Sequence, residues 1–330
     1  NGMKDFLENF RMAKYRFLLR PREYLKLSHY AGSSLRRDFI DVFKEICCNE
    51  DKSLSCTKCP KKAECAYYQV IEGGTRKDHG DLAKRFQTPP KPFVFEPPLN
   101  RKTYYGNKED LAFDLLLIGK GLQYFPYFVA TIRKIGELGM GRYHGKFTIR
   151  KILGIDLKTN YVVSEYSFSS GSEKLDRDIS VSLADLYRKN LWKEPDPLNG
   201  VEVTFLTPLR MKRVGFSNWH LYFKTLMRSV LGRMSILNYF HNDYSELVDF
   251  QEFIESARGV RISQDNLIWD DWRHPRKRDD SDHKLGGYIG DIAYAGNIED
   301  YWPFLKIAEV LHVGKNCGFG MGRILVESVK

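Results

Sequence analysis

The sequence lacks any run of about 18 uncharged apolar residues, the length a helix needs to cross a bilayer, so we expect no transmembrane segment. It also lacks an opening charged, apolar and small-residue pattern of the secretory type, and we therefore expect a cytoplasmic protein. A disordered composition is absent too, because 42% of the residues are apolar and 14% are aromatic, enough to form packed cores. With 330 residues, the chain has room for two domains.

Acidic residues are missing from one long stretch, residues 203–242, which carries a charge of +6. Residues 11–37 carry +7 and residues 133–151 carry +5, so the three segments hold +18. The formal net charge of the whole chain is +10, which leaves −8 for the other residues. Segregated positive charge is typical of a polyanion-binding surface, and an ordinary basic surface is the alternative. We favour a nucleic acid as the ligand.

Two parts of the chain repeat one pattern. Tyr124–Phe128 matches Tyr301–Leu305 at an offset of 177 residues, and Gly139–Arg142 matches Gly320–Arg323 at an offset of 181 residues. Internal similarity of this kind indicates a duplicated structural unit. The chain therefore looks like two copies of one supersecondary unit, about half a chain apart.

Hydrophobic periodicity predicts the same order of elements in each copy. We expect strands at residues 15–19, 111–118, 147–155, 201–206, 287–294 and 324–329. Helices are expected at residues 34–46, 124–138 and 219–239, and a fourth begins with Asp300 as its N-cap and Pro303 in its first turn. With one further, unassigned strand after the first helix of each copy, the order is β-α-(β)-β-α-β, which predicts an α+β fold of two tandem ferredoxin-like (RRM-like) βαββαβ domains. We place them at residues 3–195, with a Cys- and Pro-rich insertion at 47–110, and at residues 196–330.

The densest cluster of glycines lies at residues 314–323, between a predicted helix and a predicted strand. It is neither a Walker A loop, which ends in Gly-Lys-Ser/Thr, nor a dinucleotide fingerprint, which follows a strand and opens a helix. Glycines there allow backbone N–H groups to approach a phosphate chain, and Lys315 and Arg323 add positive charge. The alternative is a tight turn between helix and strand.

This carboxy-terminal Gly-Lys-x-x-x-Phe-Gly-x-Gly-Arg loop, behind two ferredoxin-like units, resembles the RAMP superfamily of CRISPR systems. The most similar members are its repeat-processing endoribonucleases, in the branch that has a cysteine-cluster insertion. Weaker resemblances lie at Tyr30–Arg37, Cys65–Tyr68, Pro92–Phe95, Trp272–Arg273 and Gly286–Gly290. The resemblance implies a protein that binds CRISPR repeat RNA, cleaves it without a metal ion, and associates with other effector subunits.

The chemistry implied by the resemblance is attack of a ribose 2′-OH on the adjacent phosphate, leaving a 2′,3′-cyclic phosphate and a 5′-OH. That reaction needs a base, an acid and a cation, and histidine suits both proton transfers. The candidates are His29 and Tyr30, before the first helix of the repeat, and His274 and His283, in a densely charged segment. For each histidine the alternative is a surface or capping role.

The RNA contacts are expected mainly at the two glycine loops and after the first strand of the second half. The expected residues are Arg142, Lys146, Arg210, Lys212, Arg213, Lys315, Gly318, Gly320, Gly322 and Arg323. Tyr143 and Phe216 are candidates for stacking on unpaired bases, whereas we expect Phe319 to pack in the core.

Five of the six cysteines fall within residues 47–65. The spacing predicts a structural metal site held by Cys48, Cys56, Cys59 and Cys65, with Cys47 as the alternative to Cys48. Zinc is the favoured ion, ahead of an iron–sulfur cluster, a disulfide or free thiols. Catalysis itself is expected to need no cofactor.

Two other functions stay open at this stage. One is a non-catalytic RAMP subunit that binds guide RNA within an effector complex. The other is a tandem ferredoxin-like regulatory or metal-binding protein with no RNA ligand, which the segregated positive charge disfavours.

Overall fold

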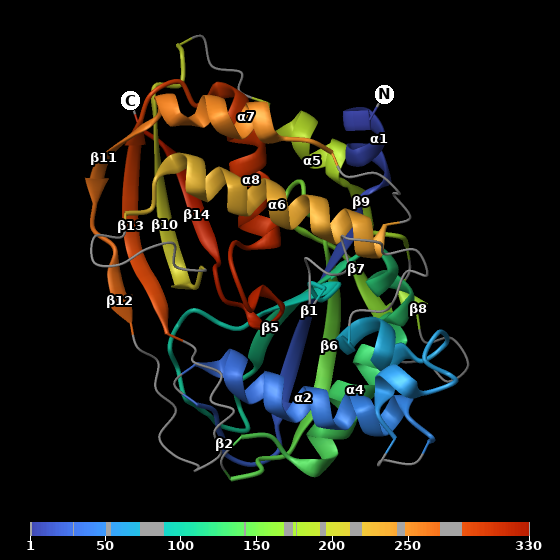
Figure 1. The fold of residues 1–330 in the computed structure, drawn as a ribbon. Helices are drawn as coiled ribbons and strands as arrows, with labels where there is room; N and C mark the ends of the chain where they lie inside the picture. Colours follow the sequence, from blue (N-terminus) through green and yellow to red (C-terminus); the bar gives the residue numbers. More distant parts are fainter. Residues whose placement is uncertain are drawn as a thin grey trace. The chain divides into compact units, whose positions relative to one another are not determined.

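A computed structural model describes residues 2–28, 30–50, 54–72, 89–141, 143–167, 174–175, 177–191, 196–211, 220–242, 248–270 and 286–329 (Figure 1). The chain divides into two compact units. Unit 1 comprises residues 1–183 and 236–246, and unit 2 comprises residues 184–235 and 247–330. The sequence placed the boundary at residue 195, and the first segment of unit 1 ends at Leu183. None of the described helices is long and apolar enough to cross a membrane.

Unit 1 contains the predicted βαββαβ order. Its elements are β1 (Arg11–Pro21), α2 (Ala31–Cys47), β3 (Phe93–Glu96), β5 (Leu111–Ile118), α4 (Phe125–Leu138) and β6 (Phe147–Ile155). The strands pair antiparallel in the order β3-β5-β1-β6, so the two strands at the centre are the first and third of the motif, as in a ferredoxin-like domain.

Several short elements extend this core of unit 1. They are α1 (Gly2–Asn9), β2 (Leu25–Lys26), which pairs with β4 (Tyr104–Tyr105), β7 (Val162–Ser167), β8 (Lys174–Leu175) and β9 (Val181–Ser182). Strands β7 and β8 continue the sheet beyond β6, and β9 pairs with the start of β1.

Unit 2 repeats the motif. Its elements are α5 (Leu183–Lys189), β10 (Gly200–Leu209), α6 (Phe223–His241), α7 (Gln251–Ser256), β11 (Arg261–Asp265), β12 (Ile268–Asp270), β13 (Gly287–Ala295), α8 (Trp302–Leu311) and β14 (Ile324–Ser328). The strand order β11-β13-β10-β14 is that of unit 1. The end of α6 clusters with unit 1. The prediction of two tandem ferredoxin-like folds is therefore confirmed.

The core of unit 1 lies between its sheet and the helices α2 and α4, which run side by side (Figure 1). Phe39 of α2 lies 5.1 Å from Phe128 of α4 and 4.9 Å from Phe95 of β3, measured between ring centroids. On β1, Tyr15 stacks on Phe125 at 4.0 Å. Burial of such aromatic rings is the main contribution to the stability of this layer.

The opposite face of β1 carries charged residues, because side chains alternate along a strand. Lys14 Nζ lies 2.7 Å from Glu96, and Arg16 Nε lies 2.7 Å from Asp114. Arg20 likewise pairs with an acid, Asp110, at 2.6 Å. Part of the positive charge counted in residues 11–37 is thus neutralised by carboxylates from distant strands.

The helix of the second copy begins differently from the prediction. A 3-10 turn, Glu299–Tyr301, runs directly into α8, so Asp300 lies within that turn and is not the N-cap of the helix. The side chain of Asn297 accepts a hydrogen bond from the first amide of the turn, Glu299 N, over 3.2 Å. Pro303 does lie in the first turn of α8, as predicted.

The glycines of the two repeated loops all have a positive φ. Gly139 and Gly141 have φ of 94° and 78°, and Gly320 and Gly322 have φ of 88° and 68°. Only glycine adopts this region without strain. A Cβ atom on Gly322 would overlap the carbonyl oxygen of Val313. The glycines of the repeat are therefore required by close backbone approaches in both units.

We predict that Gly322→Ala destabilises the protein, by about 1–2 kcal/mol for the left-handed backbone alone and by more because of the overlap. Gly232→Ala is the matched control, because a Cβ at this position of α6 meets nothing within 4 Å. Alanine favours a helix over glycine by about 1 kcal/mol, so the control should be at least as stable as wild type. Urea unfolding of both variants measures the difference, and equal stability of the two would contradict the assignment.

Candidate nucleic-acid interface

The two ends of the loop between α8 and β14 are joined by a backbone hydrogen bond, and the loop is hydrogen-bonded to β10. Val313 N donates to Gly322 O over 2.8 Å. Thr207 of β10 donates through Oγ1 to Gly320 O over 2.7 Å and accepts from Arg323 N over 2.8 Å. One hydroxyl thus forms two hydrogen bonds with the second half of the loop and fixes its position on β10.

Two backbone amides of the expected phosphate-binding loop form hydrogen bonds within the protein. Gly320 N donates to Cys317 O over 2.8 Å, and Gly322 N donates to Pro208 O over 3.0 Å. Gly318, Gly320 and Gly322 are all buried. The amides of Gly320 and Gly322 thus already have acceptors inside the protein, the first within the loop and the second on β10.

Two side chains of the loop pack inside unit 2, and for Phe319 this is the role that the sequence predicted. Phe319 is 4% exposed and belongs to the core of unit 2. Cys317 is 2% exposed, and its thiol lies 3.2 Å from Gly314 O. Burial raises the pKa of the Cys317 thiol, and the positive charge of Arg233 opposes this rise. Arg233 therefore lies near the loop.

Cations surround the outer part of the loop. Lys315 is exposed, and its amide donates to Arg210 O over 2.8 Å, which holds the two residues side by side. Arg233 of α6 donates through Nε to Leu311 O, at the end of α8, over 2.8 Å. Arg210 and the half-buried Arg323 complete the group.

Two of these guanidinium groups have unused donors. Arg210 Nη1 and Arg233 Nη2 are buried and have no acceptor among the residues that the structure describes. Buried donors are normally satisfied, and arginine forms its strongest hydrogen bonds with phosphate and carboxylate oxygens. The arrangement therefore suits an anionic ligand. Sequence reasoning did not single out Arg233, although its acid-free surroundings in residues 203–242 were a signal.

The equivalent loop of unit 1 is also held rigidly. Met140 and Gly145 exchange two backbone hydrogen bonds of 3.0 Å, and Gly141 N donates to Asp38 of α2 over 3.2 Å. Lys146 is exposed, as an RNA-binding role requires. The loop thus lies against the first half of α2, the helix that follows the candidate residue Tyr30.

The segment before α2 is bound to the helix through serine hydroxyls. Ser28 Oγ donates to Tyr30 O over 2.5 Å and lies 2.9 Å from Ser34 Oγ. Tyr30 itself is only 8% exposed. A buried phenol is poorly placed to exchange a proton with RNA, so the structure gives little support to Tyr30 as a catalytic group.

Six of the predicted site residues lie outside the described part of the chain. They are His29, Arg142, Lys212, Arg213, His274 and His283. The stacking candidate Phe216 lies outside it as well.

The structure does not show the metal site that was predicted at the cysteine cluster. Cys48, Cys56, Cys59 and Cys65 line one cavity of about 20 Å³ in unit 1. Even so, the described residues contain no group of three or more His, Cys, Asp or Glu side chains that could hold a metal ion, so the prediction of zinc is not supported. Burial and the nearby Cys65 raise the pKa of Cys47 to about 12, which keeps its thiol neutral.

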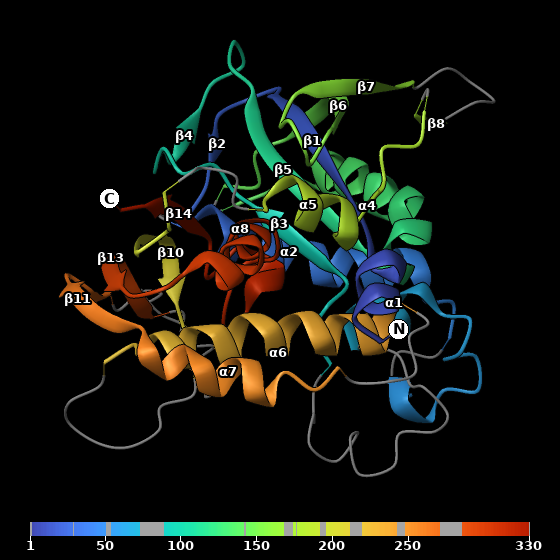
Figure 2. The same ribbon diagram turned by 90° about the horizontal axis from the view of Figure 1, so that it is seen from above.

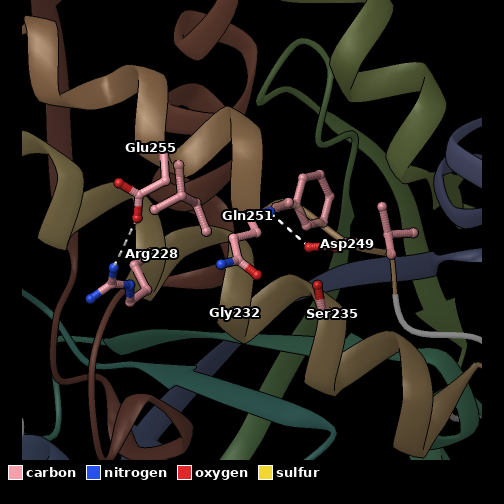
Figure 3. A pocket seen from close by; sticks show the side chains of 9 residues that line it. Arg228, Gly232, Ser235, Asp249, Gln251 and Glu255 are labelled. Carbon is pink, nitrogen blue, oxygen red and sulfur yellow. Dashed lines mark hydrogen bonds and ion pairs between the residues drawn. The ribbon is translucent and has the colours of Figure 1, made fainter.

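A larger pocket, of about 400 Å³, lies in unit 2 between α6 and α7, which run side by side (Figures 1 and 2). Figure 3 shows Arg228 paired with Glu255 at 4.0 Å across its wall. Asp249 Oδ1 accepts from Gln251 N over 2.8 Å at the other side. Charges of both signs line the pocket, and none of the predicted site residues does, so we assign it no role in RNA binding.

Comparison with protein families identifies two regions. Residues 203–324 match the family described as CRISPR-associated endoribonuclease Cas6, and residues 10–175 match a family described as an N-terminal domain. No curated protein matches the sequence.

Solved structures share the fold at low sequence identity. A chain of a partial Cas6-RT-Cas1–Cas2 complex has a TM-score of 0.56 and 11% identity, over 97% of this chain and 46% of that one. Cas6 from Thermus thermophilus has a TM-score of 0.51 and 11% identity, over 96% and 99%. A Cas6 product complex has a TM-score of 0.51 and 14% identity, over 96% and 100%.

This chain therefore spans about half of the fused chain and the full length of the others. The family matches cover most of both ferredoxin-like units. The second match includes the whole glycine loop and ends at the first residue of β14, the strand that follows the loop. Residues 203–324 therefore match the CRISPR-associated endoribonuclease Cas6 family, and the chain as a whole shares the fold of solved Cas6 structures.

Proposed function

We propose that the protein binds CRISPR repeat RNA and cleaves it without a metal ion. The ribose 2′-oxygen forms a bond to the adjacent phosphorus, and the bond from phosphorus to the 5′-oxygen breaks. The 2′-OH loses its proton to a base, and an acid supplies a proton to the leaving 5′-oxygen. The products are a 2′,3′-cyclic phosphate and a 5′-OH.

One observation carries the RNA-binding part of this proposal. The glycine loop of unit 2 is surrounded by Arg210, Arg233, Lys315 and Arg323, and buried N–H groups of two of them have no acceptor among the described residues. Such donors match phosphate oxygens, whose charge also increases at the pentacoordinate transition state. The Cas6 family match over residues 203–324 includes this loop.

For the proton transfers we propose His29. It follows Ser28, whose hydroxyl is bound to the start of α2, and it lies within the positively charged residues 11–37. A histidine with a pKa near 6.5 serves as base or acid at neutral pH. His274 and His283 are the alternatives.

Other CRISPR proteins are proposed partners, since a fold relative was solved in a complex with Cas1–Cas2.

We predict that the purified protein cleaves its host's repeat RNA in the presence of EDTA. Replacing the ribose at the cleaved linkage by 2′-deoxyribose should abolish cleavage and preserve binding, because the nucleophile is gone and the phosphates remain. Gel analysis and mass spectrometry of the products test this. Binding without cleavage of the natural RNA would instead identify a non-catalytic guide-RNA-binding subunit.

We predict that His29→Ala lowers the cleavage rate by about 10²–10⁴-fold, the usual contribution of a general acid or base. The affinity for the 2′-deoxy RNA should stay close to that of wild type. His220→Ala is the matched control, since His220 is an exposed histidine that pairs with Asp265 and has no proposed role. Single-turnover kinetics measure both variants, and unimpaired cleavage by His29→Ala would remove this residue from the mechanism.

The phosphate contacts predict a change in salt dependence. Lys315→Ala should weaken binding of repeat RNA and reduce the slope of log K against log salt by about 1. Arg233→Lys keeps the charge but loses the paired donors, so it should weaken binding with a smaller change in slope. Lys151→Ala is the control, because Lys151 already pairs with Glu165 at 3.0 Å. A slope for Lys315→Ala equal to that of wild type would contradict the contact.

A further inference from the structure

Exposed tyrosines surround one lysine on the surface of unit 1. Tyr104 of β4 is 52% exposed and Tyr143 of the glycine loop is 64% exposed. Lys26 Nζ, on β2, lies 4.6 Å from the ring centroid of Tyr104 and 5.5 Å from that of Tyr143. A fourth residue, Tyr24, precedes β2 and is 80% exposed. We call Tyr24, Lys26, Tyr104 and Tyr143 the tyrosine cluster.

The backbone that carries the cluster cannot easily shift. Lys26 pairs with Tyr104 in the β2–β4 ladder. The glycine loop packs directly on β2: a Cβ on Gly141 would overlap Lys26 O, and a Cβ on Gly145 would lie 2.6 Å from Tyr24 O. Three segments that are distant in sequence are therefore packed together through their backbones, so the positions from which the rings project are set before any ligand binds.

The charge of Lys26 is available to a ligand. Its recorded contacts within the described part of the chain are the two tyrosine rings, and no described carboxylate pairs with it. A cation over a ring face keeps its N–H donors for other acceptors. Lys146, on the same loop as Tyr143, is exposed as well, and its carbonyl accepts from Arg22 N over 2.8 Å. The surroundings of the rings are thus positive.

Flat rings beside an available cation match the chemistry of an unpaired nucleotide. Unpaired bases can stack on exposed aromatic rings, because the faces of the bases are not covered by neighbouring bases. The phosphate that links two such nucleotides can bind the cation. In a duplex the base faces are covered by their neighbours, so rings of this kind select single-stranded RNA. We propose that the tyrosine cluster binds single-stranded nucleotides of the repeat RNA, with bases on Tyr104 and Tyr143 and a phosphate on Lys26.

This inference rests on the proposed function, because its ligand is the same RNA, but it concerns a separate surface of unit 1. The experiment uses fluorescence anisotropy with fluorescein-labelled repeat RNA, either single-stranded or annealed to its complement. The double variant Tyr104→Ala/Tyr143→Ala should bind the single strand about 5- to 100-fold more weakly per ring, and the duplex as wild type does. Both side chains are exposed, so folding should be unaffected.

Two controls separate stacking from other effects. The double variant Tyr104→Phe/Tyr143→Phe keeps both rings and should bind as wild type does. Tyr161→Ala removes a tyrosine that is 74% exposed elsewhere in unit 1, and it should have no effect. If the double alanine variant binds as wild type does, or loses single strand and duplex equally, the inference is overturned and RNA binding stands. If the wild-type protein does not bind repeat RNA, the proposed function and this inference both fall.

Discussion

Both units depend on one backbone constraint: the loop before the last strand of the motif passes so close to neighbouring backbone that no side chain fits. In unit 2, Gly322 lies against Val313 O, and Gly322 N donates to Pro208 O of β10. In unit 1, Gly141 lies against Lys26 O. These contacts need glycine in a left-handed conformation, and they determine where the cations and rings of each loop are presented.

This constraint changes how the glycine loop can act on RNA. Glycine-rich loops often bind phosphate through their amides. Here the amides of Gly320 and Gly322 bond to the protein, so the loop acts as a rigid support rather than as the contact surface. In the proposed complex the phosphates contact side chains around the loop, above all Arg210, Arg233 and Lys315. Because the loop is rigid, these long side chains lose less freedom on binding than they would on a mobile segment.

Charge along the sequence and charge in space are different quantities in this protein. Lys14 and Glu96 are 82 residues apart yet form a buried hydrogen bond, and Arg16 is paired with Asp114. Part of the positive charge of residues 11–37 is therefore neutralised by ion pairs within the fold. The acid-free residues 203–242 behave differently, because Arg210 and Arg233 keep unused donors within the described structure. Counting charges along the sequence overestimated the positive charge that residues 11–37 can offer to a ligand. For residues 203–242 the same count correctly indicated cations with unused donors.

The sequence by itself determined the duplicated βαββαβ order, because apolar periodicity, the paired prolines of the two helices and the paired glycines are local signals. Strands β5 and β6 even have the predicted bounds. Tertiary structure alone decided which cations are free and whether the cysteines converge, since both depend on partners brought together by folding. It also decided that a 3-10 turn precedes α8, which displaced Asp300 from the cap, and that Tyr104 and Tyr143, from separate segments, lie around Lys26.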